Sequence, residues 1–118
     1  MLTLEDLLPK PSNIDIVHPF TGEETGAYIT VQHIGSDEMY KIRRRVNKEM
    51  GVDGEKHDEE SIVNFYIALV PYSIVGWDEQ FFGPFSKEAV DEFCSDIRKR
   101  DIVSQVAKGL IDRSRFFK

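Results

Sequence analysis

The chain has 118 residues with 41% hydrophobic and 31% charged side chains, and its net charge is −6. This length and composition predict one globular domain over residues 1–118, with an N-terminal arm and hairpin over 1–35 and a helical part over 36–118. The acidic balance argues against nucleic acid as the main partner, and no apolar run reaches the roughly 18–20 residues of a membrane span. The sequence does not start like a secretory signal and its single cysteine excludes an internal disulfide, so we expect a reducing, intracellular compartment.

The first third of the sequence predicts a β-hairpin preceded by a short arm. Residues 2–8 either form one helical turn, with leucines on one side, or remain a disordered arm. Residues 14–17 and 27–34 are rich in β-branched side chains and predict two strands joined by a loop with Pro and Gly. A lone hairpin is marginal in water, so it should pack on helices or join a partner's sheet. Its free edges offer a route to self-association.

About four helices are predicted after the hairpin, each from apolar side chains at helical spacing. Their predicted boundaries are Ser36 to Gly51, residues 59–70 after Asp58 with an end or bend at Pro71, residues 87–99 after Ser86, and a last helix after Asp101. Together with the hairpin, these helices define an α+β fold that is mostly α-helical.

The segment between the second and third predicted helices is the richest in aromatic side chains. Residues 72–93 hold the single tryptophan and four of the eight phenylalanines. Pro and Gly interrupt this segment, so it predicts an ordered loop between two helices. A dense group of rings forms either the centre of a core or a docking surface. The predicted core residues, with the tryptophan packed on the second helix, are Phe65, Leu69, Trp77, Phe85, Val90 and Phe93.

Two further features are candidates for partner binding. One face of the first helix carries several Lys and Arg side chains, and it is either a solvated surface or a site for an acidic partner. Two adjacent phenylalanines near the end of the sequence either fold back on the core or contact a partner. Together with two rings of the aromatic segment, the candidate partner-binding residues are Arg43, Arg44, Arg45, Phe81, Phe82, Phe116 and Phe117.

No group of residues points to catalysis, a metal or a cofactor. Cys94 lies on the apolar stripe of a predicted helix, which indicates a buried and inert thiol. The three histidines lack a spacing that converges on zinc, and the acid-rich run 53–60 lacks the ligand pattern of an EF-hand. Asp78 and Glu79 are adjacent carboxylates, but consecutive loop side chains need not converge as an acid–base pair. We therefore predict that the chain is not an enzyme and uses no cofactor.

Several short motifs resemble those of the tail assembly chaperones of long-tailed bacteriophages. The motifs are Val75-Gly76-Trp77-Asp78, the helix start Pro84-Phe85-Ser86, and a closing helix that ends in Arg113-Ser114-Arg115-Phe116. The resemblance covers residues 60–117, and residues 19–23 resemble the N-terminal hairpin of that family. One departure is that a compact segment follows the Gly-Trp pair where the family has a longer polar hairpin, so the contacts of this segment should differ.

The resemblance implies a non-enzymatic helper in the cytoplasm of the infected host cell. It would bind the long, aggregation-prone tape measure protein, keep it in solution and help to recruit tail-tube subunits, and it would be absent from the finished virion. The alternative is a small structural or adaptor protein of the virion, such as a tail-tube or head–tail joining subunit. Tube subunits are rich in β-structure, so the helices predicted over residues 36–118 favour the chaperone.

Overall fold

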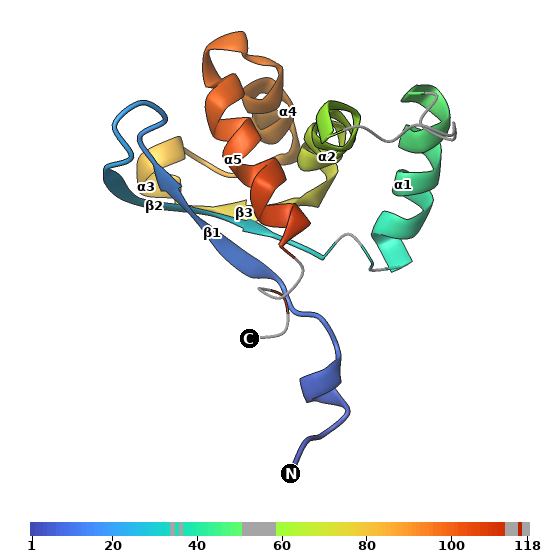
Figure 1. Ribbon diagram of the computed structural model, residues 1–118. Helices are drawn as coiled ribbons and strands as arrows, with labels where there is room; N and C mark the ends of the chain where they lie inside the picture. Colours follow the sequence, from blue (N-terminus) through green and yellow to red (C-terminus); the bar gives the residue numbers. More distant parts are fainter. Residues whose placement is uncertain (34, 36, 51–58, 113–115, 117–118) are drawn as a thin grey trace.

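The computed structural model describes residues 1–33, 35, 37–50, 59–112 and 116 (Figure 1). Its elements are η1 (Glu5–Leu7), β1 (Ser12–Val17), β2 (Glu24–Val31), α1 (Asp37–Met50), α2 (Glu59–Ser73), β3 (Ile74–Trp77), α3 (Glu79–Phe82), α4 (Lys87–Ser95), η2 (Ile97–Lys99) and α5 (Arg100–Ile111). This mixed, mostly helical fold confirms the predicted fold class. The predicted caps Ser36, Gly51 and Asp58 lie outside the described residues, as do residues 53–58 of the acid-rich run.

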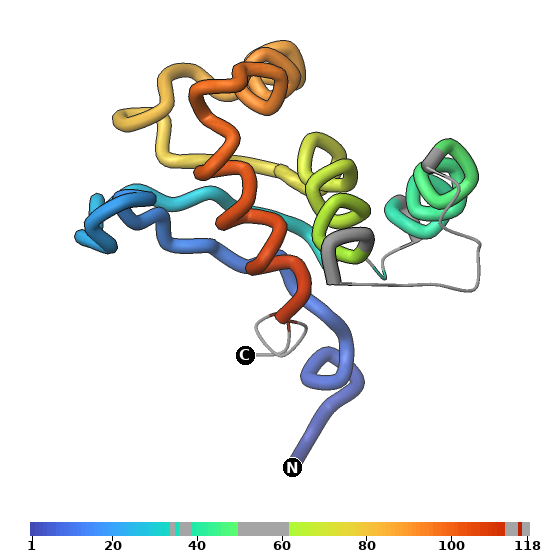
Figure 2. The backbone as a smooth tube through the Cα atoms, turned by 45° about the horizontal axis from the view of Figure 1, so that its top comes forward, coloured from blue at the N-terminus to red at the C-terminus, as the bar shows by residue number. Residues whose placement is uncertain are grey.

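The three strands form an antiparallel sheet in the order β1-β2-β3, so β2 is the central strand. Ile14 of β1 pairs with Ile29 of β2, which pairs in turn with Trp77 of β3. In β1, Ile14 and Ile16 are buried while Asp15 between them is exposed, because successive side chains of a strand point to opposite faces. Helix α5 lies across the buried face, with α2 beside it (Figures 1 and 2).

The aromatic segment lies between the second and third predicted helices, as expected, but it begins with a strand that the sequence did not predict. Ile74 pairs with Val31, and Gly76 pairs with the preceding residue of β2, which leaves Val75 as an extra residue in β3. A β-bulge of this kind turns one side chain away from its neighbours. Val75 is therefore exposed between the buried Ile74 and Trp77. The outer edges of this sheet belong to β1 and β3, so within the described residues β1 is the strand of the predicted hairpin that has an edge without a partner strand.

Helix α1 packs beside α2, and α2 leads directly into β3. Met39 and Val46 of α1 are buried and Ile42 is half-buried, as their helical spacing predicts. The second helix does not stop at Pro71 but continues to Ser73, whose hydroxyl donates to the carbonyl of Val70 at 2.9 Å.

Helix α5 packs closely on the first strand. Apolar side chains at helical spacing form its inner face, and Val103, Val106, Ala107 and Leu110 are all buried. Gly109 is buried as well, and a Cβ atom at this position would lie 2.8 Å from Ile14 Cγ1. Glycine therefore allows the helix to approach the strand more closely than any larger residue would. The predicted cap at Asp101 is wrong, because α5 begins at Arg100 directly after η2 and Asp101 lies inside its first turn.

The side chain of Gln105 on α5 is hydrogen-bonded to the backbone of Val17 in β1. The pairing of β1 with β2 shifts between Asp15 and Val17. At this irregularity, the Gln105 side-chain amide donates to the Val17 carbonyl at 2.8 Å and accepts from the Val17 N–H at 3.0 Å. The amide thus makes both of the bonds that a neighbouring strand would make with this residue.

We expect Gln105→Leu to lower the free energy of unfolding by about 1–2 kcal/mol, because it leaves two partly buried backbone groups without a partner. Urea unfolding followed by circular dichroism measures this change. Gln80→Leu is the matched control, since Gln80 is exposed on α3 and its replacement should change the stability by less than about 0.5 kcal/mol. Equal effects of the two variants would show that the amide does not stabilise β1.

The aromatic segment forms one cluster around Trp77, which is 5% exposed. Its ring centroid lies 5.5 Å from Phe82, 5.4 Å from Phe85 and 5.7 Å from Phe93, and its Nε1–H donates to the carbonyl of Gly83 at 2.9 Å. These partners come from the residues that follow Trp77 in the chain. Of the predicted core residues, Leu69, Trp77, Val90 and Phe93 are buried, Phe65 is half-buried against the core and packs edge-to-face on Tyr66, and Phe85 is 36% exposed.

Phe116 was a candidate for partner binding, but in this structure its side chain is fully buried, so the ring folds back on the core, the other alternative that the sequence left open. Its ring packs edge-on against His33 with 5.0 Å between centroids, and its carbonyl accepts from the backbone N–H of Lys10 at 2.7 Å. The residue therefore belongs to the hydrophobic core, and its carbonyl is bonded to the segment just before β1. Phe117 lies outside the described residues.

Candidate partner-binding groove

A hollow of about 730 Å³ lies between α1, the end of α2, β3 and the start of α4. This volume falls within the ~300–1,000 Å³ that is usual for binding pockets. Its apolar surface comes from Ile42, Tyr72, Ile74, Val75, Phe85 and Val90. Three charged side chains also line it, namely Arg45, Lys87 and Asp91. We call this hollow the groove.

Local structure explains why apolar side chains remain open to solvent here. Tyr72 lies in the last turn of α2, Val75 is the bulged residue of β3, and Phe85 precedes the Ser86 cap of α4. Tyr72 and Phe85 lie where one element passes into the next, and the bulge turns the Val75 side chain away from the buried face of the sheet. The exposed fractions are 41% for Tyr72, 44% for Val75 and 36% for Phe85. The Phe85 backbone N–H donates to Glu79 Oε2 at 3.1 Å, which fixes the approach to α4.

Arg45 brings positive charge to one side of the groove. Its guanidinium carbon lies 5.2 Å from the centroid of the Tyr72 ring, a cation–π contact that joins α1 to the end of α2. Its Nε also lies 3.9 Å from Glu49 one turn further along α1, but both side chains are exposed and such pairs contribute little. Lys87 is the first residue of α4 and also lines the groove. The lining therefore contains two cations, Arg45 and Lys87, and one carboxylate, that of Asp91.

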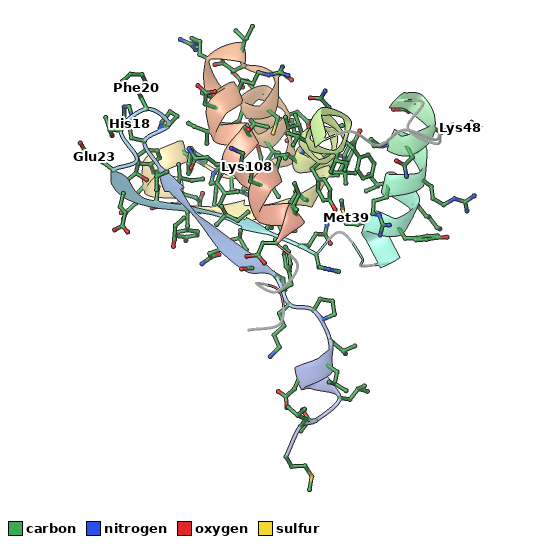
Figure 3. All side chains as sticks on the ribbon, in the orientation of Figure 1. His18, Phe20, Glu23, Met39, Lys48 and Lys108 are labelled. Carbon is green, nitrogen blue, oxygen red and sulfur yellow. The ribbon has the colours of Figure 1, made fainter. Side chains whose placement is uncertain are left out.

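The three consecutive arginines of α1 do not form one surface. Consecutive residues of a helix are about 100° apart around its axis, so they point in different directions. Arg45 lines the groove, whereas Arg44 is exposed with its guanidinium 6.0 Å from the Tyr40 ring. Arg43 is half-buried and has a partner within the structure. Lys48 lies on the side of α1 that faces away from α2 (Figure 3).

The two candidate rings of the aromatic segment differ in exposure. Phe81 is 53% exposed on α3, and it packs only on Phe82 among the ring contacts of the described residues, at 4.8 Å between centroids. Phe82 is half-buried because it also packs on Trp77 and on Phe93, the latter at 5.5 Å. Phe81 is therefore available to a partner, while Phe82 mainly supports the cluster. Neither residue lines the groove.

The residues that were considered for catalysis have structural roles. The Asp78 carboxylate caps α3 by accepting from the Gln80 N–H at 3.1 Å, and Glu79 accepts from the backbone of Phe85. These carboxylates serve separate hydrogen bonds. Cys94 is half-buried, and burial together with the charge of Asp91 raises the pKa of its thiol to about 11. A thiol with this pKa is almost entirely protonated at neutral pH and is a poor nucleophile.

The described residues contain neither a metal-binding group nor a membrane-spanning helix. No group of three or more His, Cys, Asp or Glu side chains in the described part of the chain is arranged to hold a metal ion. Among the helices described here, none combines the length and the apolar character needed to cross a membrane.

Comparison of the chain with protein-family models, with curated proteins and with solved structures found no match in any of the three. The resemblance to tail assembly chaperones therefore stays a prediction from short motifs. The residues that line the groove were mostly not predicted as a site. Tyr72 and Val75 are ordinary apolar residues in the sequence, and only the bulge in β3 and the packing of α1 bring them together.

Proposed function

We propose that this chain is a tail assembly chaperone of a long-tailed bacteriophage, which binds the tape measure protein in the host cytoplasm and leaves before the virion is complete. The groove is the observation that supports this proposal most directly. It combines an apolar lining with two cations and one carboxylate, and it lies on a mostly helical domain. An apolar groove of this size accepts the apolar side chains of an amphipathic helix.

The chemistry of the groove defines the segment of the client that it would bind. Tyr72, Val75 and Phe85 would cover an apolar stripe, and Arg45 and Lys87 would face acidic residues beside that stripe. A tape measure protein is long, so many copies of the chaperone can bind along it. Weak individual sites then suffice, because binding at many places on one client gives a high total affinity. Weak sites also let tail-tube subunits displace the chaperone as they assemble.

The alternative function is a structural or adaptor protein of the virion. One observation favours it, since β1 and β3 have outer edges to which no strand of the described chain is paired. Such edges can join the sheets of neighbouring subunits. These strands are short, with six residues in β1 and four in β3, and the latter carries a bulge. Short and bulged edges disfavour continuous sheets between subunits.

The test is co-expression with the tape measure protein encoded alongside this chain. We expect that protein to be insoluble alone and soluble with the wild-type chain. Val75→Asp should abolish the effect, because it places a carboxylate in the apolar lining and weakens binding by more than about tenfold. Phe20→Asp is the matched control, since Phe20 is 93% exposed at the tip of the β1–β2 loop, away from the groove (Figure 3).

Two results would contradict the proposal. The tape measure protein could stay insoluble in the presence of the folded wild-type chain, which would exclude it as the client. Mass spectrometry of purified virions could find the chain in stoichiometric amounts, which would favour the structural or adaptor protein.

A further inference from the structure

The first eight residues form an arm that carries exposed apolar side chains. Figure 1 shows this arm extending away from the sheet and the helices. None of its residues is buried in the structure. Its apolar side chains have exposed fractions between 49% and 119%, and they are Met1, Leu2, Leu4, Leu7 and Leu8. Exposure of so much contiguous apolar surface in water is unfavourable and usually marks an interaction site.

The arm is already folded into a helical turn. The Asp6 carboxylate accepts from the Thr3 N–H at 2.8 Å and from the Thr3 hydroxyl at 3.0 Å, which closes the first turn around η1. Thr3 donates both of these bonds, so the arrangement is the half of a capping box in which an acidic side chain accepts from the backbone N–H three residues earlier. Leu4 and Leu7 have the three-residue spacing that places side chains on one side of a 3-10 turn, and Leu8 follows at its C-cap. The arm thus displays a preformed apolar stripe, which lowers the entropy cost of binding.

The groove has the complementary chemistry. It offers apolar side chains at Tyr72, Val75 and Phe85 that nothing in the described chain covers completely, and its cations are Arg45 and Lys87. The arm carries two acidic side chains, Glu5 and Asp6, in the same turn as its leucines. The stripe matches the apolar lining, and the acidic residues match the two cations, which outnumber the single carboxylate of the lining, that of Asp91.

We propose that the arm of one copy of this chain docks in the groove of a second copy, as an amphipathic helical turn in an apolar groove. The exposed leucines of the arm, the apolar lining of the groove and their opposite charges support this pairing. Its consequence for regulation rests on the proposed function, because the arm would then occupy the site that the client needs. Self-association would protect the groove until a long client, with many segments of the same chemistry, displaces the arms.

The test is sedimentation equilibrium of the purified chain without any client. We expect the wild-type chain to self-associate, more weakly at high salt. Leu4→Asp with Leu7→Asp should weaken the association more than about tenfold, because burial of two leucines is lost. The matched control is Phe20→Asp with Ile97→Asp, which removes two apolar side chains that are even more exposed than Leu4 and Leu7 and lie outside the arm and the groove, and which adds the same charge. The arm residues are exposed, so circular dichroism should show an unchanged fold.

A mixing experiment separates docking between copies from docking within one copy. The double arm variant keeps its groove, and Val75→Asp keeps its arm, so each should be monomeric alone and the two should form a mixed dimer. A monomeric wild-type chain, an arm variant that associates like the wild type, or a mixture without dimers would each overturn the proposal. Because no client is present, these results do not depend on whether the tape measure protein is the partner.

Discussion

Trp77→Ala is expected to lower the free energy of unfolding by about 3–5 kcal/mol, a large share of the ~5–15 kcal/mol that stabilises a domain of this size. Trp77 is 5% exposed and its ring packs on Phe82, Phe85 and Phe93. Its removal leaves a cavity where β3, α3 and α4 meet, and it also leaves the Gly83 carbonyl without its indole donor. Urea unfolding followed by far-ultraviolet circular dichroism measures the loss.

Trp77→Phe is the matched variant for this prediction. It keeps a ring in the cluster and removes the N–H group, so we expect a smaller cost of about 1–2 kcal/mol. If Trp77→Ala retained the wild-type melting temperature but lost client binding, the tryptophan would be an exposed anchor for the partner. That outcome would contradict its placement in the core.

Phe116→Ala should also cost about 3–5 kcal/mol, since its side chain is fully buried and a phenylalanine-sized cavity is not easily closed. The substitution removes the edge-on contact with His33. The hydrogen bond from the Lys10 N–H to the carbonyl of residue 116 can still form. The decrease in the free energy of unfolding therefore reports the contribution of the phenylalanine ring alone. Thermal unfolding is a suitable measurement, with a decrease of several degrees in Tm expected for each kcal/mol.

The control for this prediction is Phe20→Ala, because Phe20 is 93% exposed and its replacement should change the stability by less than about 0.5 kcal/mol. If Phe116→Ala unfolded like the wild type but failed to bind the client, the ring would contact the partner, and its assignment to the core would be wrong. The two variants together decide between a core role and a partner role for this ring.

Local patterns in the sequence predict most of the helical part of the fold. The Ser86 hydroxyl caps α4 by accepting from the Ala89 N–H at 3.0 Å, and Val90 and Phe93 are buried on its inner face. The inner face of α5 follows from helical spacing in the same way. These features depend on residues close together in the chain, so they can be predicted without knowledge of the packing.

The third strand could not be predicted in this way. Its buried residues, Ile74 and Trp77, are three positions apart, while a regular strand buries every second residue. The extra residue in the bulge accounts for the difference, and the bulge itself depends on pairing with β2, more than 40 positions earlier in the chain. Glycine at position 76 and the surrounding rings made a loop the more probable structure from the sequence alone.

The candidate site was predicted only in part for the same reason. Arg45 lines the groove, but Arg43 and Arg44 do not, because their neighbouring positions in a helix point elsewhere. Tyr72 and Val75 line the same groove because α2 leads directly into β3 and α1 lies beside them. This arrangement depends on the packing of the elements and cannot be seen in the sequence. The burial of Phe116 depends on its contact with a ring far away in the sequence, so its adjacency to another phenylalanine gave no reliable indication of its environment.

The bond between Gln105 and Val17 has a consequence for synthesis of the protein, since it joins residues that are 88 positions apart. At a translation rate of ~5–20 residues per second, the ribosome needs roughly 4–18 s to proceed from one to the other. During this time β1 and β2 can pair, but the helix that covers Ile14 and Ile16 has not yet been made. A two-stranded hairpin is only marginally stable on its own. The nascent chain therefore exposes the apolar face of its first strands for several seconds, and completion of the fold must wait until α5 has left the ribosome.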